Sequence, residues 1–356
     1  MDVYVTDKTM RKEVLKMISP GTPLRQGLDN VLKAKTGGLI VIATDESVMD
    51  LVDGGFAIHV EYTPSYLYEL AKMDGAIVLN SDVDEILYAN TQLIPDYSIK
   101  TSETGTRHRT AERVAKQTKA IVIAISQRRN VISVYKGDQK YVVEDISKIF
   151  TKANQALQTL EKYKSVLDQA VASLNTLEFN GFVTIYDVAL VLQKIEMVMR
   201  VTDIIESYLL ELGVEGALIK MQLEELMGST REDRELVLKD YGTQISSSEF
   251  KEKLANLTED ELLDLTNIAR ILGYTGVSEN MDMPIKTKGY RVLNKIHRLP
   301  RTIIENLVKY FDNFQDILTA SIEELDEVEG IGEIRATYIR NGLVKMKQLA
   351  LLDRHI

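Results

Sequence analysis

AIVIAISQRRNVISVYKGDQKYVVE, residues 120–144, is the stretch that decides the fold of the N-terminal part of this chain. Its two apolar, β-branched runs, at 120–126 and 130–135, have the length and composition of buried strands. Lys136-Gly137-Asp138 then interrupts the pattern before KYVVE, which predicts a hairpin that adds one more strand. Strands that are apolar on both faces are typical of an α/β domain, whose helices cover the sheet.

Upstream of this stretch, short apolar runs alternate with helical patterns. Thr22-Pro23 reads as an N-cap followed by proline at the first helical position, so we expect a helix from there through Lys33. Further helices are expected near 64–72 and 107–119, and strands at 38–44, 55–60, 76–80 and 85–93. The sequence therefore predicts an α/β domain over residues 1–147, with a mixed sheet flanked by helices.

From residue 148 the pattern changes to apolar side chains at spacings of three and four, which is the period of long helices. We predict an all-α spine over residues 148–284 that acts as a linker or oligomerisation domain, followed by a separate domain over 285–356. The spine contains no constellation of chemically active residues, so its sequence alone is also that of a simple packing module or spacer.

The tail contains a glycine-rich turn, VEGIGEIRATYI at 328–339, between two apolar patterns. Its Gly330-Ile331-Gly332 predicts the hairpin of a helix-hairpin-helix motif, and Leu299-Pro300 occupies a related place upstream. Such hairpins present backbone amides to phosphate oxygens, and glycine removes the Cβ that would keep the backbone at a distance. From residue 286 onward 12 Lys and Arg face 10 Asp and Glu, while the whole chain has a net charge of −10. The resemblance to helix-hairpin-helix motifs implies non-sequence-specific binding to duplex or branched DNA, although a tight turn without a ligand would have the same glycines.

Composition excludes several classes of site. The chain has no cysteine and four histidines, so disulfides, thiolate chemistry and a multi-histidine metal site are not expected. A metal ion would have to be a hard cation bound by oxygen, which suits Mg²⁺ or Mn²⁺. The apolar runs are far shorter than a bilayer span, and the start MDVYVTDKTMRKEV does not have the pattern of a signal peptide. We expect a cytoplasmic protein with no membrane partner.

ETGTRHRTAER, residues 103–113, places Arg107, His108 and Arg109 together at the start of an expected helix, which Thr104 or Thr106 is expected to cap. Positive side chains at a helix N-terminus oppose the helix dipole, unless an anion is bound there. Two arginines can clamp phosphate oxygens, and first-turn amides can add hydrogen bonds. The cluster therefore predicts a polyphosphate site, with a solvated basic turn as the alternative.

Two other stretches add groups of the kind that such a site needs. Asp74-Gly75 precedes an expected buried strand, where a carboxylate could hold a divalent ion beside a nucleotide, although Asp-Gly is also an ordinary turn. Ser126-Gln127-Arg128-Arg129 follows the strand at 120–126, at a carboxyl end, which is the usual ligand side of an α/β sheet.

Together, DGA at 74–76, GTRHRTA at 105–111 and ISQRRNVISVY at 125–135 resemble the diadenylate cyclase family, and the domain order resembles its members with a helix-hairpin-helix tail. The resemblance implies an enzyme that condenses two ATP molecules into cyclic di-AMP and two pyrophosphates. It implies an octamer in which cyclase domains face each other, and DNA binding through the tail that couples DNA state to synthesis.

The resemblance also implies roles for individual residues. Asp74 would support the metal ion and the attacking hydroxyl, and Arg107, His108 and Arg109 would contact phosphates as catalytic residues. The ATP-binding residues would be Gly75, Ala76, Leu93, Thr106, Thr110, Ser126 and Arg128. The DNA-binding residues would be Leu299, Pro300, Gly330, Ile331 and Gly332.

Other functions remain open at this level. A non-catalytic, nucleotide-sensing adaptor in DNA repair or scanning would have the same domains but no turnover. A different nucleotidyltransferase or an ATPase is disfavoured because the sequence has no GxxxxGK[ST] loop. A transcription regulator would need side chains that read bases, whereas the hairpin offers mainly backbone amides.

Overall fold

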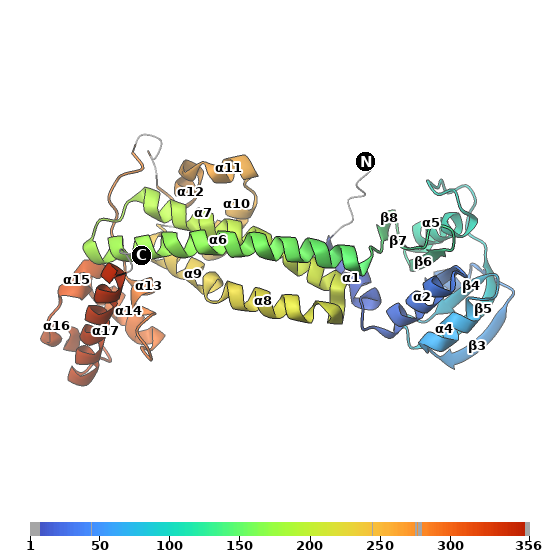
Figure 1. The fold of residues 1–356 in the computed structure, drawn as a ribbon, viewed down its shortest axis with the longest axis horizontal. Coiled ribbons are helices and arrows are strands. Elements are labelled where there is room, and N and C mark those ends of the chain that lie inside the picture. The colour runs from blue at the N-terminus through green and yellow to red at the C-terminus, as the bar shows by residue number, and fades with distance from the viewer. Residues whose placement is uncertain (1–7, 44, 244, 275, 277–279, 353–356) are drawn as a thin grey trace. The chain divides into compact units, whose positions relative to one another are not determined.

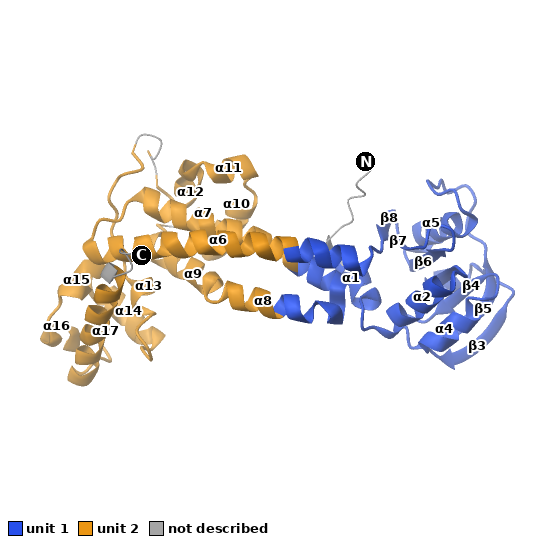
Figure 2. Ribbon diagram, viewed as in Figure 1, with its two compact units in different colours: residues 1–154, 206–220 blue, residues 155–205, 221–356 orange. Residues whose placement is uncertain are grey.

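A computed structural model describes residues 8–352 except 44, 244, 275 and 277–279. The chain divides into two compact units, which Figure 2 shows in different colours. Unit 1 comprises residues 1–154 and 206–220, and unit 2 comprises residues 155–205 and 221–356. Each unit is described by itself below.

Unit 1 is built on a mixed sheet in which the described residues form eight strands (Figure 1). The order is β2-β5-β4-β1-β6-β7-β8, and β3 also pairs with β5. Only β1 and β4 pair in parallel among the described strands; the other pairs are antiparallel. The strands are β1 Gly38–Ile42, β2 Val52–Asp53, β3 Phe56–Glu61, β4 Ala76–Leu79, β5 Glu85–Leu93, β6 Ile121–Ser126, β7 Val131–Lys136 and β8 Gln139–Val142.

Helices cover both faces of this sheet, because side chains along each central strand alternate between two apolar cores. Ile40 and Ile42 of β1 pack in the core that contains α1 Lys8–Ile18, α2 Pro23–Ala34 and α4 Pro64–Leu70. Leu39 and Val41 pack on the opposite face, with α3 Glu46–Met49 and α5 Thr106–Thr118. The predicted mixed sheet flanked by helices is confirmed.

Local signals in the sequence are also found in the structure. Thr22 caps α2, where its side chain accepts a hydrogen bond from the Arg25 amide, and Pro23 is the first helical residue. Gly137 has φ of +55° in the turn between β7 and β8, so the predicted hairpin is present.

Long helices follow the sheet. The described helices between the sheet and the tail are α6 Ile146–Asn180, α7 Ile185–Leu212, the short 3₁₀ helix Gly213–Gly216, α8 Ala217–Met227, α9 Thr230–Tyr241, α10 Ser247–Ala255, α11 Glu259–Leu263 and α12 Leu265–Ile271. α6 ends at Asn180, and Gly181, with φ of +72°, follows it. The predicted long helical region is confirmed. Among the described residues, no helix is both long enough and apolar enough to cross a membrane.

The C-terminal part of unit 2 consists of five helices around one apolar core, among the residues that the structure describes. They are α13 Tyr290–Leu293, α14 Arg301–Tyr310, α15 Phe314–Thr319, α16 Ile322–Asp326 and α17 Glu333–Leu352. Phe179, near the end of α6, packs in the same core and stacks edge to face with Phe314.

A buried polar network joins this C-terminal part to α6 and α9. Arg291 donates hydrogen bonds to both carboxylate oxygens of Glu178, and neither side chain is exposed by more than 1%. The side chain of Asp240 accepts the backbone amides of Gly289, Tyr290 and Arg291. Burial and the nearby Glu178 charge raise the pKa of Asp240 to about 7, although these amides and Arg291 act in the opposite direction. The network anchors α13 by buried, directional contacts.

Candidate active site

The candidate catalytic residues gather at one edge of the sheet, where three strands begin or end. Because β1 and β4 are parallel, the Asp74-Gly75 turn before β4 lies on the same edge as the start of β1. Because β6 runs antiparallel to β1, with Gly38 opposite Ile125, its last residue Ser126 reaches the same edge. The site therefore combines residues that precede β4 with residues at the carboxyl end of β6, where Ser126 was expected. The antiparallel direction of β6 brings these groups together.

Gly75 is required by the fold itself. Its φ is +105°, and a Cβ there would lie 2.8 Å from the backbone carbon of Asn90 and 2.9 Å from the Thr91 carbonyl oxygen. The glycine therefore permits close approach of β5 as well as any approach of a nucleotide.

Helix α5 begins differently from the predicted caps. Its N-cap is Gly105, which makes no side-chain capping hydrogen bond, and Thr106 is already helical. Thr104 instead accepts a hydrogen bond from Nη2 of Arg129 at 3.3 Å. The prediction that Thr104 or Thr106 caps this helix was wrong. A helix start without a capping side chain keeps amides of its first turn open to an anion.

Asp74 and Arg107 face each other across this edge. Nη2 of Arg107 lies 3.5 Å from Oδ1 of Asp74, and the Asp74 side chain is fully exposed. An exposed ion pair at that distance contributes little stability, so the carboxylate can exchange this partner for a bound cation.

Two adjoining cavities flank Arg107. We call them the Leu93 cavity, of about 430 Å³, and the Arg128 cavity, of about 670 Å³. Gly75, Thr106 and Arg107 line both. The Leu93 cavity is also lined by the candidates Ala76, Leu93, Arg109 and Thr110, and the Arg128 cavity by Asp74, His108, Ser126 and Arg128. The structure thus brings all the sequence-predicted residues of unit 1 to one continuous site.

The walls of the two cavities differ in chemistry. Leu39, Ala76, Leu93 and Tyr97 give the Leu93 cavity an apolar side. Arg107, Arg128 and Arg129 give the Arg128 cavity three guanidinium groups around one volume. The pair can therefore hold a molecule with an apolar, aromatic end and a polyanionic end.

His108 lies beneath the Arg128 cavity in a small hydrogen-bonded cluster. Its Nδ1 is 2.9 Å from the Tyr135 hydroxyl, which lies 2.9 Å from Oε1 of Glu103, and Lys140 also binds that oxygen. Burial lowers the pKa of His108, and the nearby cations Lys140 and Arg129 lower it further, whereas Glu103 opposes them. The imidazole is therefore neutral at pH 7.

The tail hairpins lie together in unit 2. Tyr338 of α17 donates a 2.6 Å hydrogen bond to the carbonyl of His297, in the turn that ends at Leu299 and Pro300. Gly330 has φ of +81°, and a Cβ on it would lie 2.9 Å from Ile303. Ile331 is buried in the core, so only its backbone can contact a ligand. The nearest atom to a Cβ on Gly332 would be Oδ1 of Asp326 at 3.9 Å, so its side toward solvent is open.

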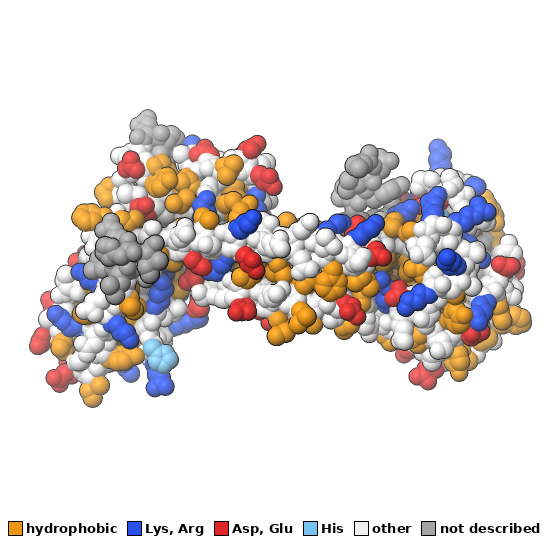
Figure 3. All heavy atoms as spheres, viewed as in Figure 1, with side chains coloured by type: hydrophobic (Ala, Val, Ile, Leu, Met, Phe, Trp, Pro, Cys, Tyr) orange, Lys and Arg blue, Asp and Glu red, His pale blue; other side chains and the backbone are white. Residues whose placement is uncertain are grey.

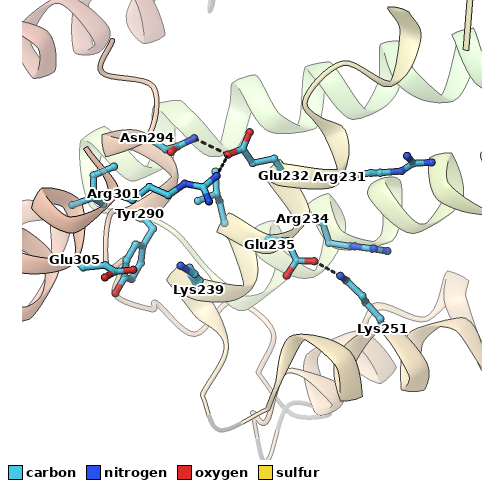
Figure 4. A pocket seen from close by; sticks show the side chains of 12 residues that line it. Arg231, Glu232, Arg234, Glu235, Lys239, Lys251, Tyr290, Asn294, Arg301 and Glu305 are labelled. Carbon is cyan, nitrogen blue, oxygen red and sulfur yellow. Dashed lines mark hydrogen bonds and ion pairs between the residues drawn. The ribbon is translucent and has the colours of Figure 1, made fainter. Parts of the chain in front are cut away.

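A further cavity of about 580 Å³ in unit 2 lies among α9, α10, α13 and α14. Figure 4 shows Arg301 and Asn294 directed at Glu232, and Lys251 directed at Glu235. Arg231, Arg234 and Lys239 also line this cavity, where three glutamates offset part of the positive charge.

Comparison with known proteins follows the same division of the chain. A family model described as the DisA bacterial checkpoint controller nucleotide-binding region matches residues 25–140, and one described as the DisA linker region matches residues 143–281. The DNA integrity scanning protein DisA of Clostridioides difficile (strain 630) is 73% identical over 357 residues, which cover 100% of both chains. This chain belongs to the DisA family.

Another member of the DisA family, the DNA integrity scanning protein DisA of Clostridium kluyveri, is 55% identical over 343 residues. The match covers 96% of this chain and 97% of the relative. The two cavities lie within the matched nucleotide-binding region, and Lys140 of the cluster that supports His108 is the last residue of that region. Unit 1 therefore carries the nucleotide-binding region of the DisA family.

The residues of the site test whether a divalent ion fits. Among the described residues, no group of three or more His, Asp and Glu side chains could hold a metal ion. Asp74 does offer an exposed, hard oxygen ligand at the mouth of the Arg128 cavity. Mg²⁺ commonly binds through one or two carboxylates together with substrate phosphates and water, so this site fits such an ion when nucleotide is present.

Sequence reasoning missed several residues of this candidate site. Tyr97 and Arg113 line the Leu93 cavity, and Arg113 lies 5.2 Å from the Tyr97 ring centroid in a cation–π contact. Glu103 and Tyr135 support His108 from below. Glu103 and Tyr135 lie inside the sequence motifs quoted above. No spacing rule, however, relates a loop carboxylate to a tyrosine 32 residues later.

Proposed function

We propose that this protein is a diadenylate cyclase, a nucleotidyltransferase that condenses two ATP molecules into cyclic di-AMP and two pyrophosphates. The observation that carries the proposal is the pair of adjoining cavities that share Arg107, one with an apolar side and one lined by guanidinium groups and Asp74. Membership of the DisA family, with its nucleotide-binding region, supports it.

The two cavities suit the two ends of ATP. Leu93, Ala76 and Leu39 provide apolar surface for adenine in a volume of about 430 Å³. The triphosphate would extend past Arg107 toward Ser126 and Arg128 in the larger cavity. Thr106 and Thr110 lie alongside, where hydroxyls can donate to phosphate oxygens.

The reaction needs orientation and charge neutralisation. The ribose 3′-hydroxyl of each ATP attacks the α-phosphorus of the other. In each of the two transfers the new P–O bond forms as the bond to the pyrophosphate oxygen breaks, and the hydroxyl proton passes to solvent. Arg107, Arg109 and Arg128 would stabilise negative charge on the phosphates and on the departing pyrophosphate. Mg²⁺ or Mn²⁺, held by Asp74 and phosphate oxygens, would lower the pKa of the hydroxyl. His108 would lie beside the phosphates, in the wall of the Arg128 cavity.

Symmetry requires two copies of the site. Each site holds one ATP, and the product is two-fold symmetric, so two protomers must place their nucleotides face to face. We propose a homo-oligomer, an octamer, in which helical surfaces supply other contacts. Figure 3 shows apolar side chains over α8, where Leu218 and Met221 are 73% and 65% exposed.

The arginine clamp can be tested by a double substitution. We expect Arg107→Ala with Arg109→Ala to lower the rate of cyclic di-AMP formation by at least about 10²-fold, because two charges that neutralise phosphate are lost. The measurement is mass spectrometry of product formed from ATP with Mg²⁺ or Mn²⁺. Lys12→Ala with Lys33→Ala removes the same charge from exposed positions on α1 and α2 and serves as the control. Equal activity of the two double variants would contradict the clamp.

We propose that the tail binds the backbone of duplex or branched DNA without reading sequence, and that DNA binding regulates synthesis. The support is the pair of hairpins that Tyr338 joins, with the open face of Gly332 beside them. Such a protein is expected to act in the cytoplasm, where ATP and the chromosome are both accessible.

The two hairpin glycines separate DNA binding from folding. Gly332→Ala places a Cβ on an open surface, so we expect unchanged stability and weaker DNA binding. Gly330→Ala forces alanine into a left-handed conformation, so we expect a stability cost of roughly 1–2 kcal/mol. Salt-dependent DNA binding and thermal unfolding provide the measurements. Full DNA affinity in a folded Gly332→Ala protein would exclude this hairpin as a close contact.

A further inference from the structure

Four side chains form a continuous chain from the back of the Arg128 cavity into unit 1. Lys140 of β8 forms an ion pair with Glu103, which accepts a hydrogen bond from the Tyr135 hydroxyl of β7. The same hydroxyl is hydrogen-bonded to Nδ1 of His108 on α5. Tyr135 is 1% exposed, so its hydroxyl has no access to solvent and depends on these partners. The arrangement fixes the direction of each hydrogen bond.

Glu103 can only accept. Burial by itself would raise the pKa of Glu103, but hydrogen bonds from Lys140 and Tyr135 outweigh it and lower the pKa overall. An ionised carboxylate has no proton to donate. The single hydroxyl proton of Tyr135 therefore points to Glu103.

The direction of that bond decides the tautomer of His108. Since the Tyr135 proton is committed to Glu103, the Tyr135 oxygen can only accept from the imidazole, so Nδ1 must carry hydrogen. A neutral imidazole has one N–H, and Nε2 is then left with a lone pair. Nε2 is buried and has no protein partner among the described residues. A buried polar atom without a partner is costly and calls for a functional explanation.

We propose that Glu103 and Tyr135 are positioning residues for nucleotidyl transfer, which hold His108 as the Nδ1–H tautomer so that Nε2 serves as a neutral hydrogen-bond acceptor at the Arg128 cavity. This inference rests on the proposed cyclase function. Arg107, Arg128 and Arg129 of the same cavity can only donate, and its acceptors Asp74 and Glu103 are carboxylates, so an imidazole in this tautomer adds an uncharged acceptor. Its natural partner is a hydroxyl of the substrate.

The tautomer itself can be read by spectroscopy without any turnover. We expect solid-state ¹⁵N NMR of sedimented full-length protein, labelled at histidine, to show His108 protonated at Nδ1 and unprotonated at Nε2. With four histidines in the chain, His108→Gln identifies the signal by its loss. Tyr135→Phe should lose the fixed Nδ1–H form. Glu103→Leu should shift the proton of His108 from Nδ1 to Nε2, because the Tyr135 hydroxyl can then donate to Nδ1. Glu103→Gln keeps an acceptor oxygen and should preserve the Nδ1–H tautomer.

Kinetics provide the second readout. Tyr135→Phe should lower kcat by about 10-fold to 100-fold, the range for outer partners that orient a histidine, with little change in KM for ATP. Tyr141→Phe is the matched control on the adjacent strand β8: it also removes a tyrosine hydroxyl bonded to a carboxylate, that of Glu211 at 2.8 Å, but has no bond to His108. It should retain the wild-type kcat.

The outcomes separate this inference from the cyclase proposal. If the wild-type protein makes no cyclic di-AMP, the cyclase proposal fails, while NMR still reports the tautomer. A wild-type spectrum with His108 protonated at Nε2 would overturn the positioning role, and so would an unchanged kcat in a folded Tyr135→Phe protein that binds ATP. If Tyr135→Phe does not fold, the wild-type spectrum and the Glu103→Leu and Glu103→Gln pair decide.

Discussion

Asp74→Asn is expected to lower the rate of cyclic di-AMP formation by about 10²–10³-fold or more, the effect of losing a group that stabilises charge in a transition state. The substitution keeps the size and one oxygen of the side chain but removes the charge that would hold a divalent ion. Because the Asp74 side chain is fully exposed and its contact with Arg107 is long, the fold should not change. ATP binding should change far less than the rate, since the cavity walls remain. Mass spectrometry of the product and calorimetry of ATP binding measure the two quantities.

A matched control exists in the same unit. Asp53 also precedes a glycine and is exposed, but its carboxylate does not line either cavity. Asp53→Asn should therefore synthesise cyclic di-AMP at the wild-type rate. Wild-type protein that binds ATP but yields no product would favour the nucleotide-sensing adaptor instead, and an active Asp74→Asn protein would remove Asp74 from the proposed mechanism.

Glu178→Gln is expected to destabilise the C-terminal part of unit 2 by about 3–5 kcal/mol, because it leaves the charge of Arg291 buried without its partner. Arg291 is 1% exposed, and Glu178 is its ion-pair partner and also accepts from the Tyr241 hydroxyl at 2.6 Å. Water cannot replace the lost charge at such a depth. Urea titration followed by hydrogen–deuterium exchange of peptides from α13 and α14 measures the local loss.

The control for this substitution lies on the same helix. Asp168 of α6 pairs with Lys164 one turn away, and its side chain is 59% exposed. Asp168→Asn should change stability by only about 0–1 kcal/mol, since water screens an exposed pair. Similar exchange profiles for the two variants would mean that the buried pair does not anchor α13.

Much of the fold could be predicted because local pattern and tertiary structure agree. The apolar run at 120–126 became β6, and the Lys136-Gly137-Asp138 interruption became the turn to β8. Pairing direction could not be predicted, since a run that is apolar on both faces does not specify its neighbours. Sequence motifs therefore identified the candidate residues. The edge of the sheet at which they lie together is set by the antiparallel pairing of β6 with β1.

One error and one incomplete interpretation have the same physical origin. The helix cap was assigned to a threonine because threonine is a favoured N-cap, but Gly105 takes that position while Thr104 binds Arg129. Arg291 was counted in the basic balance of the tail, but it is buried and paired with Glu178. In both cases a tertiary partner, which is distant in sequence, decides what a side chain does.

The exposure of Asp74 has a thermodynamic consequence for the order of events. Asp74 offers a single carboxylate, and the guanidinium of Arg107 lies 3.5 Å from it. By itself this carboxylate would bind a divalent ion only weakly. In the proposed site the nucleotide would supply the remaining oxygens, so the ion and ATP should strengthen each other's binding by the same factor. The ion would then bind together with the nucleotide. A low concentration of either one would weaken the apparent affinity of the protein for the other.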